Sequence, residues 1–191
     1  TPLLRTHLRA LQNRPLLRTD GVRLVSKHFQ DHLPAGERAL AQADLRLFWS
    51  YRIFPPAILT GLPQWVAARR RPQVGDTVAQ QIQLPPTLVG PRARVILGTS
   101  LTEVVDEPKV KRYSYQTLEG HLEVGTCSFE LAETPDGIQA SIRSHSALNP
   151  WWLQAARPLP GWYQDWCSQQ AVQGLLRGVR LGLPATAPRP T

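Results

Sequence analysis

The sequence predicts an α+β domain in which helices cover an antiparallel β-sheet. In residues 113–131, two segments of alternating polar and apolar side chains flank a turn, the pattern of a β-hairpin with one buried face. In residues 162–181, apolar side chains instead recur every three or four positions, as in an amphipathic helix. The predicted order is a strand, one or two helices, about five strands and the long helix. We therefore expect a single domain over residues 21–182.

The composition is typical of a globular protein with a basic surface. Of 191 residues, 42% are hydrophobic and 19% are charged, and 22 Lys and Arg against 14 Asp and Glu give a net charge of +8. A basic protein favours nucleic acid, anionic lipid or acidic ligands as partners. The arginines are dispersed, however, and their one run, Arg69-Arg70-Arg71 before Pro72, is typical of a solvated loop. With no zinc-finger spacing or aromatic nucleic-acid motif, nucleic acid is disfavoured as a partner.

The cysteines and the hydropathy exclude several other classes of protein. Cys127 and Cys167 have no CxxC spacing, so we expect buried, inert thiols rather than a disulfide framework or a zinc site. No motif indicates a cofactor, and we expect none. No apolar stretch approaches the length of about 18 residues needed for a membrane span. The first residues also lack the apolar core of a signal peptide, so the sequence predicts a cytoplasmic protein.

The first third of the chain contains one clear helical period. Leu40, Ala43, Leu47 and Tyr51 recur at three and four residues, and Pro55-Pro56 then disfavours further helix. The predictions here are a lead-in over residues 1–20 with at most one helical turn, a strand over 22–29, a helix of about four turns over 37–51, and a second helix over 58–68 carrying Trp65.

The middle of the chain has the period of β-strands. Short alternating segments are separated by proline, glycine and the tight-turn pair Asp136-Gly137. In the hairpin, the turn at residues 118–121 joins two rows of side chains that each share one face of their strand: Tyr113, Tyr115 and Thr117, and Cys127, Phe129 and Leu131. The predicted strands cover residues 77–84, 92–97 with a bend at Gly98 into 101–105, 110–117, 124–131 and 138–143.

The C-terminal helix combines a broad apolar face with a row of small residues. In this row, Cys167, Ala171, Gly174 and Gly178 project within about a quarter-turn of one another. Small side chains either let a helix approach the sheet closely or leave room for a ligand. Residues 183–191 contain three prolines, and we expect a disordered tail. The apolar face consists of Tyr163, Ala171, Val172, Leu175, Leu176 and Val179.

Three motifs resemble those of a known family. They are the run from Tyr115 to Gly125 (YQTLEGHLEVG), the segment from Tyr51 to Pro56 (YRIFPP), and Val74-Gly75-Asp76 before a strand. Together they resemble the family called domain of unknown function nineteen-ninety, in the START and birch-pollen-allergen (SRPBCC) superfamily, over about residues 21–180. This resemblance implies a helix-grip fold, in which a curved antiparallel sheet wraps the C-terminal helix and encloses an apolar cavity. It implies no established activity.

These observations predict a protein that binds a small apolar or amphipathic molecule between the sheet and the C-terminal helix. A largely apolar pocket with a few polar groups is the usual composition of such a site. His121 and Glu123 are also candidates for an acid–base pair, although either could instead hydrogen-bond the hairpin turn. Two assured ligands are too few for a metal site. The predicted ligand-binding residues are Tyr113, Tyr115, Thr117, His121, Glu123, Phe129, Ile142, Arg143 and Leu175.

An alternative is a protein that binds no ligand and acts through an interaction surface, for example as a homodimer. Four of the six tryptophans crowd into residues 151–166. They either pack under the loop that precedes the C-terminal helix or form a surface for a partner. These four residues are Trp151, Trp152, Trp162 and Trp166.

Overall fold

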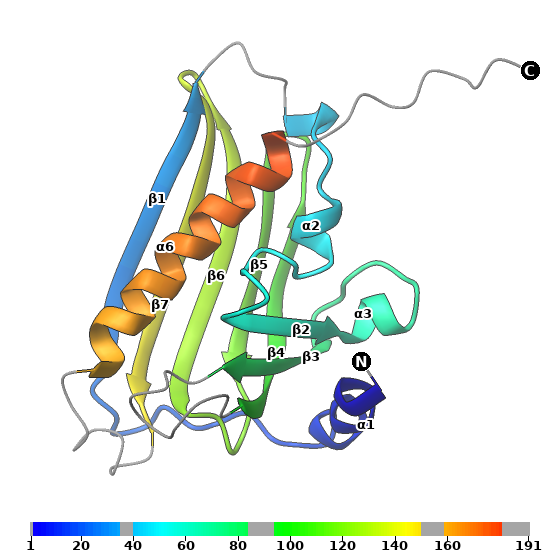
Figure 1. Ribbon diagram of the computed structural model, residues 1–191, viewed down its shortest axis with the longest axis vertical. Helices are drawn as coiled ribbons and strands as arrows, with labels where there is room; N and C mark the ends of the chain where they lie inside the picture. Colours follow the sequence, from blue (N-terminus) through cyan, green and yellow to red (C-terminus); the bar gives the residue numbers. More distant parts are fainter. Residues whose placement is uncertain (1, 35–39, 84–93, 150–158, 181–191) are drawn as a thin grey trace, which may run out of the picture.

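The computed structural model describes residues 2–34, 40–83, 94–149 and 159–180 and has the predicted α+β architecture (Figure 1). Within these residues, seven strands form one antiparallel sheet in the order β1-β7-β6-β5-β4-β3-β2. Strands β2 to β7 follow one another as a meander, and β1 pairs with β7 to complete the sheet. The strands are β1 (Val25–Pro34), β2 (Leu59–Pro63), β3 (Thr77–Gln83), β4 (Arg94–Asp106), β5 (Val110–Thr117), β6 (Glu123–Thr134) and β7 (Gly137–Leu148).

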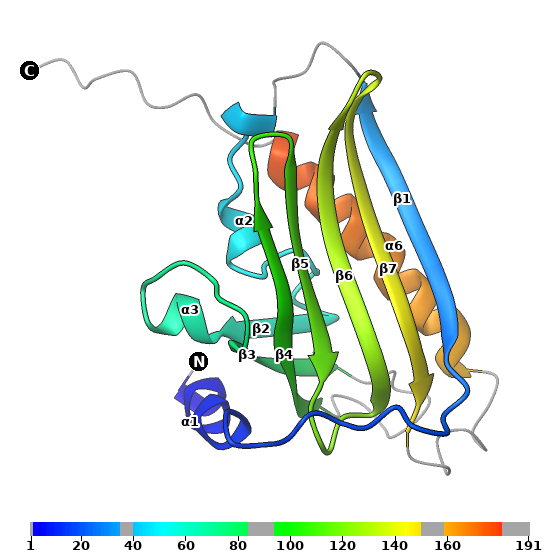
Figure 2. The same cartoon turned by 180° about the vertical axis from the view of Figure 1, so that it is seen from behind.

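The C-terminal helix α6 (Leu159–Arg180) lies across one face of the sheet, which we call the inner face (Figure 1). The short helix α2 (Arg46–Trp49) also contacts α6, and α3 (Gln64–Ala67) directly follows β2. Seen from behind, strands β5 to β7 and β1 have no described helix over their outer face (Figure 2). No helix in the described part of the chain is long and apolar enough to cross a membrane.

The core lies between the inner face and α6. Ile138, Ala140 and Ile142 alternate along β7 as predicted, and each is at most 2% exposed. The apolar face of α6 also packs here, so these two elements bury each other's apolar side chains. The members of the core contributed by α6 are Ala171, Val172, Leu175, Leu176 and Val179. The side chain of Tyr163 lies outside the described residues.

Helix α6 packs closely against the segment that follows α2 at Gly174. A Cβ atom at this position would collide with the backbone carbonyl oxygen of Ile53. At Gly178 it would meet Leu47 Cβ at 3.4 Å, which is an ordinary contact. Close packing is therefore the role of the small residue at position 174.

The N-terminal lead-in differs from the prediction, because it contains the ten-residue helix α1 (Pro2–Leu11). Proline suits the first turn of a helix, where its missing N–H has no partner to lose. Leu4, Leu8 and Leu11 are buried against the sheet around Ala79, in a second small core. Strand β1 begins at Val25, three residues later than predicted, and continues to Pro34.

The prediction of a four-turn helix over residues 37–51 is wrong. The described part, from Leu40, is helical only in the 3₁₀ turn η1 (Leu40–Gln42) and in α2. The side chain of Asp44 accepts a hydrogen bond from the Arg46 N–H at 2.9 Å, a local bond that competes with a continuous helix before α2. Tyr51 has a φ of 58°, a left-handed conformation that ends α2.

The second predicted helix, over residues 58–68, is helical only in its last part. Trp65 lies in α3 as expected, but Leu59–Pro63 forms the edge strand β2. Its hydrogen bonds come from β3, which is distant in sequence, and this partner overrides the local apolar pattern.

The remaining strands confirm the prediction with small changes. Tyr113 pairs with Phe129 and Tyr115 with Cys127, so the hairpin presents the expected rows on one face. Strand β4 is continuous through Gly98, and its irregularity falls between Leu101 and Glu103 instead. The tail at residues 183–191 lies outside the described residues.

Candidate functional site

A cavity of about 190 Å³ lies between the inner face of the sheet and the first turns of α6. Its walls come from β2 to β7, from the hairpin turn after β5, and from α6. Apolar atoms form most of the surface of this lining, and Glu123, Ser146 and Gln164 place polar groups near the start of α6. The apolar lining includes Phe54, Ile58, Leu59, Ile82, Leu97, Leu122, Phe129, Ile142 and Leu148, and the polar lining includes Gln80, Tyr115, Thr117, His121, Glu123, Ser144, Ser146, Gln164 and Ser168.

Six of the nine predicted ligand-binding residues line this cavity: Tyr115, Thr117, His121, Glu123, Phe129 and Ile142. The other three lie elsewhere. Tyr113 and Leu175 belong to the filled core beside the cavity. Arg143 is exposed on the outer face of β7, opposite His28, because neighbouring residues of a strand point to opposite faces. The expectation that Arg143 faces the cavity is therefore wrong.

His121 follows the tight turn between β5 and β6. Gly120 has a φ of 84° there, and the His121 N–H donates to the carbonyl oxygen of Leu118 at 3.1 Å. This turn directs the imidazole into the cavity lining, where the residue is only 8% exposed.

The two ring nitrogens of His121 have different surroundings. Nδ1 lies 3.0 Å from both the backbone nitrogen and the carbonyl oxygen of Glu123. Nε2 is buried and has no hydrogen-bond partner within the described structure. Burial lowers the pKa of His121 to about 4, more than its backbone contact with Glu123 raises it, so the imidazole is neutral at neutral pH.

The carboxylate of Glu123 joins the sheet to the start of α6. Gln164 Nε2 donates to Glu123 Oε2 at 3.0 Å, and Ser146 Oγ donates to the same oxygen at 3.3 Å. Lys27 Nζ donates in turn to Gln164 Oε1 at 3.1 Å and to Asp165 Oδ1 at 2.5 Å. Burial raises the pKa of Glu123, and the bond from Ser146, the charge of Lys27 and the bond from Gln164 partly offset this effect.

A second polar chain lies deeper along the inner face. Gln80 Nε2 donates to Tyr51 Oη at 2.7 Å, and Tyr51 is also hydrogen-bonded to Tyr115. Burial raises the pKa of Tyr115, and it raises the pKa of Cys127 to about 12. The hydroxyl and thiol groups of this chain therefore stay protonated at neutral pH and act as neutral hydrogen-bonding groups.

The two candidate acid–base residues do not contact each other through their side chains. The imidazole bonds the backbone of Glu123, whereas the carboxylate accepts hydrogen bonds from Gln164 and Ser146. Among the described residues, no three His, Cys, Asp or Glu side chains are grouped so as to hold a metal ion. The arrangement offers a group of hydrogen-bonding side chains at one end of the cavity.

Several lining residues escaped the sequence analysis. Gln164 and Ser168 lie at helical spacing beside Cys167, which the sequence indicated only as a member of the small-residue row, and this cluster on one side of α6 was the available signal. Leu59 and Gln80 could be found only from the pairing of β2 with β3. Both cysteines line the cavity, Cys127 from β6 and Cys167 from α6.

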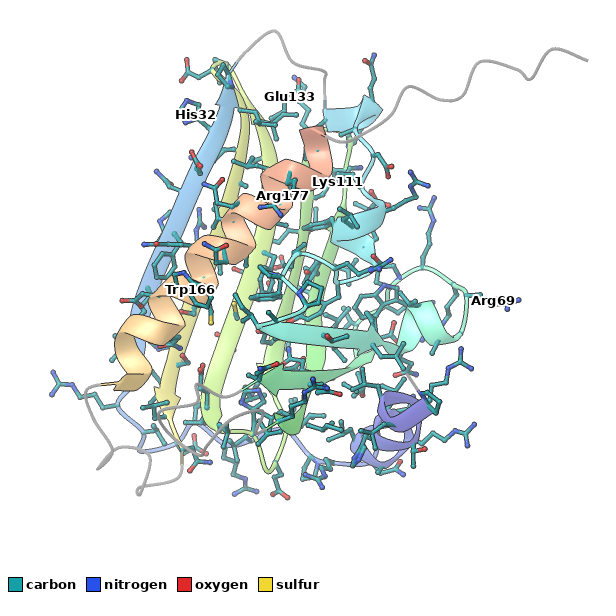
Figure 3. All side chains as sticks on the ribbon, in the orientation of Figure 1. His32, Arg69, Lys111, Glu133, Trp166 and Arg177 are labelled. Atoms are coloured by element: carbon teal, nitrogen blue, oxygen red, sulfur yellow. The ribbon has the colours of Figure 1, made fainter. Side chains whose placement is uncertain are left out.

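The tryptophan-rich segment is described only in part. Trp166, labelled in Figure 3, lies on α6 and is 42% exposed. Trp151, Trp152 and the side chain of Trp162 lie outside the described residues. The expectation that these four residues pack under a loop or form an interface stays a prediction.

Comparison with known proteins shows the family and the fold. A family model described as "Domain of unknown function (DUF1990)" matches residues 23–174. No curated protein matches the chain. The solved structures that it resembles share too little sequence to indicate more than a common fold.

Three of these structures are representative. The di-domain ARO/CYC StfQ from the steffimycin biosynthetic pathway has a TM-score of 0.53 at 15% identity, over 83% of this chain and 50% of that one. The present chain thus spans half of that two-domain protein. A putative uncharacterized protein from Rhizobium leguminosarum has a TM-score of 0.52 at 10% identity, over 82% and 95%. Major latex-like protein 151 from Panax ginseng has a TM-score of 0.50 at 14% identity, over 85% and 99%. The fold is therefore the START-like helix-grip fold.

Proposed function

The chain belongs to the DUF1990 family, and we propose that it binds a small apolar or amphipathic molecule in the cavity between the sheet and α6. The observation that carries this proposal is the cavity itself, which adjoins a filled core. Protein interiors are otherwise close-packed and contain few voids larger than a water molecule.

The size of the cavity supports a small ligand. An apolar cavity of about 150 Å³ in another protein binds benzene, so about 190 Å³ has room for a compound of one or two rings.

The distribution of polar groups supports an amphipathic ligand. Phe54, Ile82 and Phe129 provide an apolar wall, whereas His121, Glu123 and Gln164 provide hydrogen-bonding groups. Binding sites for small molecules commonly combine a mainly apolar lining with a few polar groups that fix orientation. No contact in the described structure favours the acid–base enzyme or the ligand-free interaction protein over this reading.

Native mass spectrometry of gently purified protein, followed by denaturing extraction, tests the proposal. We expect a small molecule bound to the folded species, or binding of added naphthalene by the ligand-free protein. Ser144 lines the cavity, so Ser144→Ile should fill it and reduce binding at least tenfold. Ser128→Ile is the matched control, because Ser128 pairs with Arg143 on the outer face of the neighbouring strand.

Two results would contradict the proposal. One is a wild-type protein that carries no molecule and does not bind naphthalene; a clean dimer mass would then favour the interaction protein. The other is equal loss of binding in both isoleucine variants, which would show that the effect does not come from the cavity.

A further inference from the structure

We infer that the ligand is an uncharged molecule with a hydroxyl group, and that this hydroxyl hydrogen-bonds Nε2 of His121. The inference rests on the proposed function and specifies the chemistry of the same cavity. It starts from Nε2, which is buried, lies in a residue of the cavity lining and has no partner in the described structure. A buried polar atom without a hydrogen bond is costly and uncommon in native proteins.

The surroundings of Nδ1 indicate which group Nε2 prefers. Nδ1 can accept a hydrogen bond from the Glu123 N–H or donate one to the Glu123 carbonyl oxygen, each over 3.0 Å. In the first tautomer Nε2 carries the proton and donates; in the second it accepts. A hydroxyl group both donates and accepts, so it pairs with either tautomer. A carbonyl group, by contrast, pairs with only one.

The charges around the cavity disfavour an anionic ligand. No lysine or arginine is among the described residues that line it, and its only ionisable carboxyl group is that of Glu123. Lys27 is not among the lining residues, and its ammonium group already bonds Gln164 and Asp165. The buried imidazole is neutral, because burial lowers the pKa of His121 to about 4. A carboxylate or phosphate would therefore lose its hydration without gaining an opposite charge.

Three probes with the same ring system separate the effect of a hydroxyl group from that of a negative charge: naphthalene, 2-naphthol and 2-naphthoate. They would be titrated by calorimetry into ligand-free protein at neutral pH. We expect 2-naphthol to bind about five-fold more tightly than naphthalene, the usual effect of one net hydrogen bond. We expect 2-naphthoate to bind on the order of tenfold more weakly than naphthalene, because its charge stays uncompensated.

The variant His121→Asn tests whether Nε2 causes the tighter binding of 2-naphthol. The asparagine amide reaches the position of Nδ1 and can keep the bond to the Glu123 backbone, but nothing replaces Nε2. We expect the ratio of the naphthalene to the 2-naphthol dissociation constant to fall from about five to about one in this variant. A second readout needs no variant: the ¹⁵N shift of His121 Nε2 in wild-type protein should move with 2-naphthol and much less with naphthalene.

The outcomes distinguish the two proposals. If none of the three probes binds the ligand-free protein, both the proposed function and this inference are overturned. If naphthalene binds but 2-naphthol binds no better, or if the preference survives in His121→Asn with an unmoved Nε2 shift, only this inference fails. Tighter binding of 2-naphthoate than of naphthalene would also overturn it.

Discussion

The two ends of the inner face are built from the same strands and the same helix, yet one is filled and the other encloses a cavity. At the filled end, near the turn between β6 and β7, Leu131 and Ala140 are fully buried and pair across the two strands. At the cavity end, near the start of α6, Glu123 and Ser146 face the same helix. The difference therefore comes from the side chains and not from the backbone elements.

Polarity changes in the same direction along three elements. Towards the cavity end, each inward row passes from apolar residues to polar ones. No single position creates the cavity, because all three rows become polar at the same level of the sheet. The rows are Leu131, Phe129, Cys127, Gly125 and Glu123 on β6; Ile138, Ala140, Ile142, Ser144 and Ser146 on β7; and Leu176, Val172, Ser168 and Gln164 on α6.

The largest expected effect is the loss of packing at the filled end. Leu131→Ala should lower the free energy of unfolding by about 4 kcal/mol, because the side chain is completely buried and its removal leaves a void. Leu59→Ala should cost only about 2 kcal/mol, because Leu59 already borders the cavity and loses contacts on fewer sides. Urea denaturation measures both. Equal losses would contradict the distinction between the two ends.

The next effect is the pH dependence of stability at the cavity end. The pKa of His121 falls from an ordinary 6.5 to about 4 in the folded protein. The unfolded state therefore binds more protons than the folded state between pH 4 and pH 6.5. The contribution of His121 to the free energy of unfolding is complete above pH 6.5 and is lost as the pH falls towards 4. The difference between the two pKa values corresponds to roughly 3 kcal/mol of unfolding free energy.

The comparison of wild type with His121→Asn isolates this effect. Burial raises the pKa of Glu123, so its contribution has the opposite sign: it is lost as the pH rises above the ordinary value of 4.5. Both proteins keep Glu123, so its contribution cancels in the difference between them. Urea denaturation at several pH values should show the stability advantage of the wild type shrinking as the pH falls. An advantage independent of pH would place the imidazole in water.

The filled end was more predictable from sequence than the cavity end. Ile138, Ala140 and Ile142 alternate within one strand, and Val172, Leu175 and Leu176 follow the helical period, so local patterns were enough. The cavity depends on which residues of several strands lie at one level, and this requires the register between strands. Alternation alone could have removed one error, because Ile142 and its neighbour Arg143 cannot face the same side.

The segments with wrong predictions depend on partners distant in sequence. Leu59–Pro63 is apolar enough for a buried helix, and only β3 makes it a strand. Tyr51 continues a helical period in sequence, but its side chain is held in the core by Gln80 and its φ is positive. Such long-range contacts leave no local pattern that identifies them.

A smaller effect tests whether the position of α6 sets the size of the cavity. Alanine is a better helix former than glycine by about 0.5–1 kcal/mol, so Gly178→Ala should be neutral or slightly stabilising. Gly174→Ala should instead cost about 2 kcal/mol, because its Cβ would push α6 away from the carbonyl of Ile53. Thermal and urea denaturation compare the two variants. Equal stabilities would mean that α6 can shift freely, so that its distance from the sheet does not fix the cavity.

The smallest expected effect on stability comes from breaking the ion pair between Lys27 and Asp165, which lies near the cavity end. Their side chains are 25% and 44% exposed, so Lys27→Met should cost less than about 1 kcal/mol. The substitution should also have an electrostatic effect, because the positive charge of Lys27 lowers the pKa of Glu123. Removing that charge should therefore raise this pKa further, which ¹³C NMR titration of the Glu123 carboxyl carbon would detect.

The matched control is Lys111→Met at the filled end, where Lys111 pairs with Asp106 at 2.6 Å (Figure 3). It removes the same charge and should leave the pKa of Glu123 unchanged, since Lys111 is not among the groups that shift it. If both variants moved this pKa equally, the effect would come from the net charge of the protein. A shift confined to Lys27→Met would instead show that the contacts at the cavity end control the ionisation of a group lining the cavity while adding little to stability.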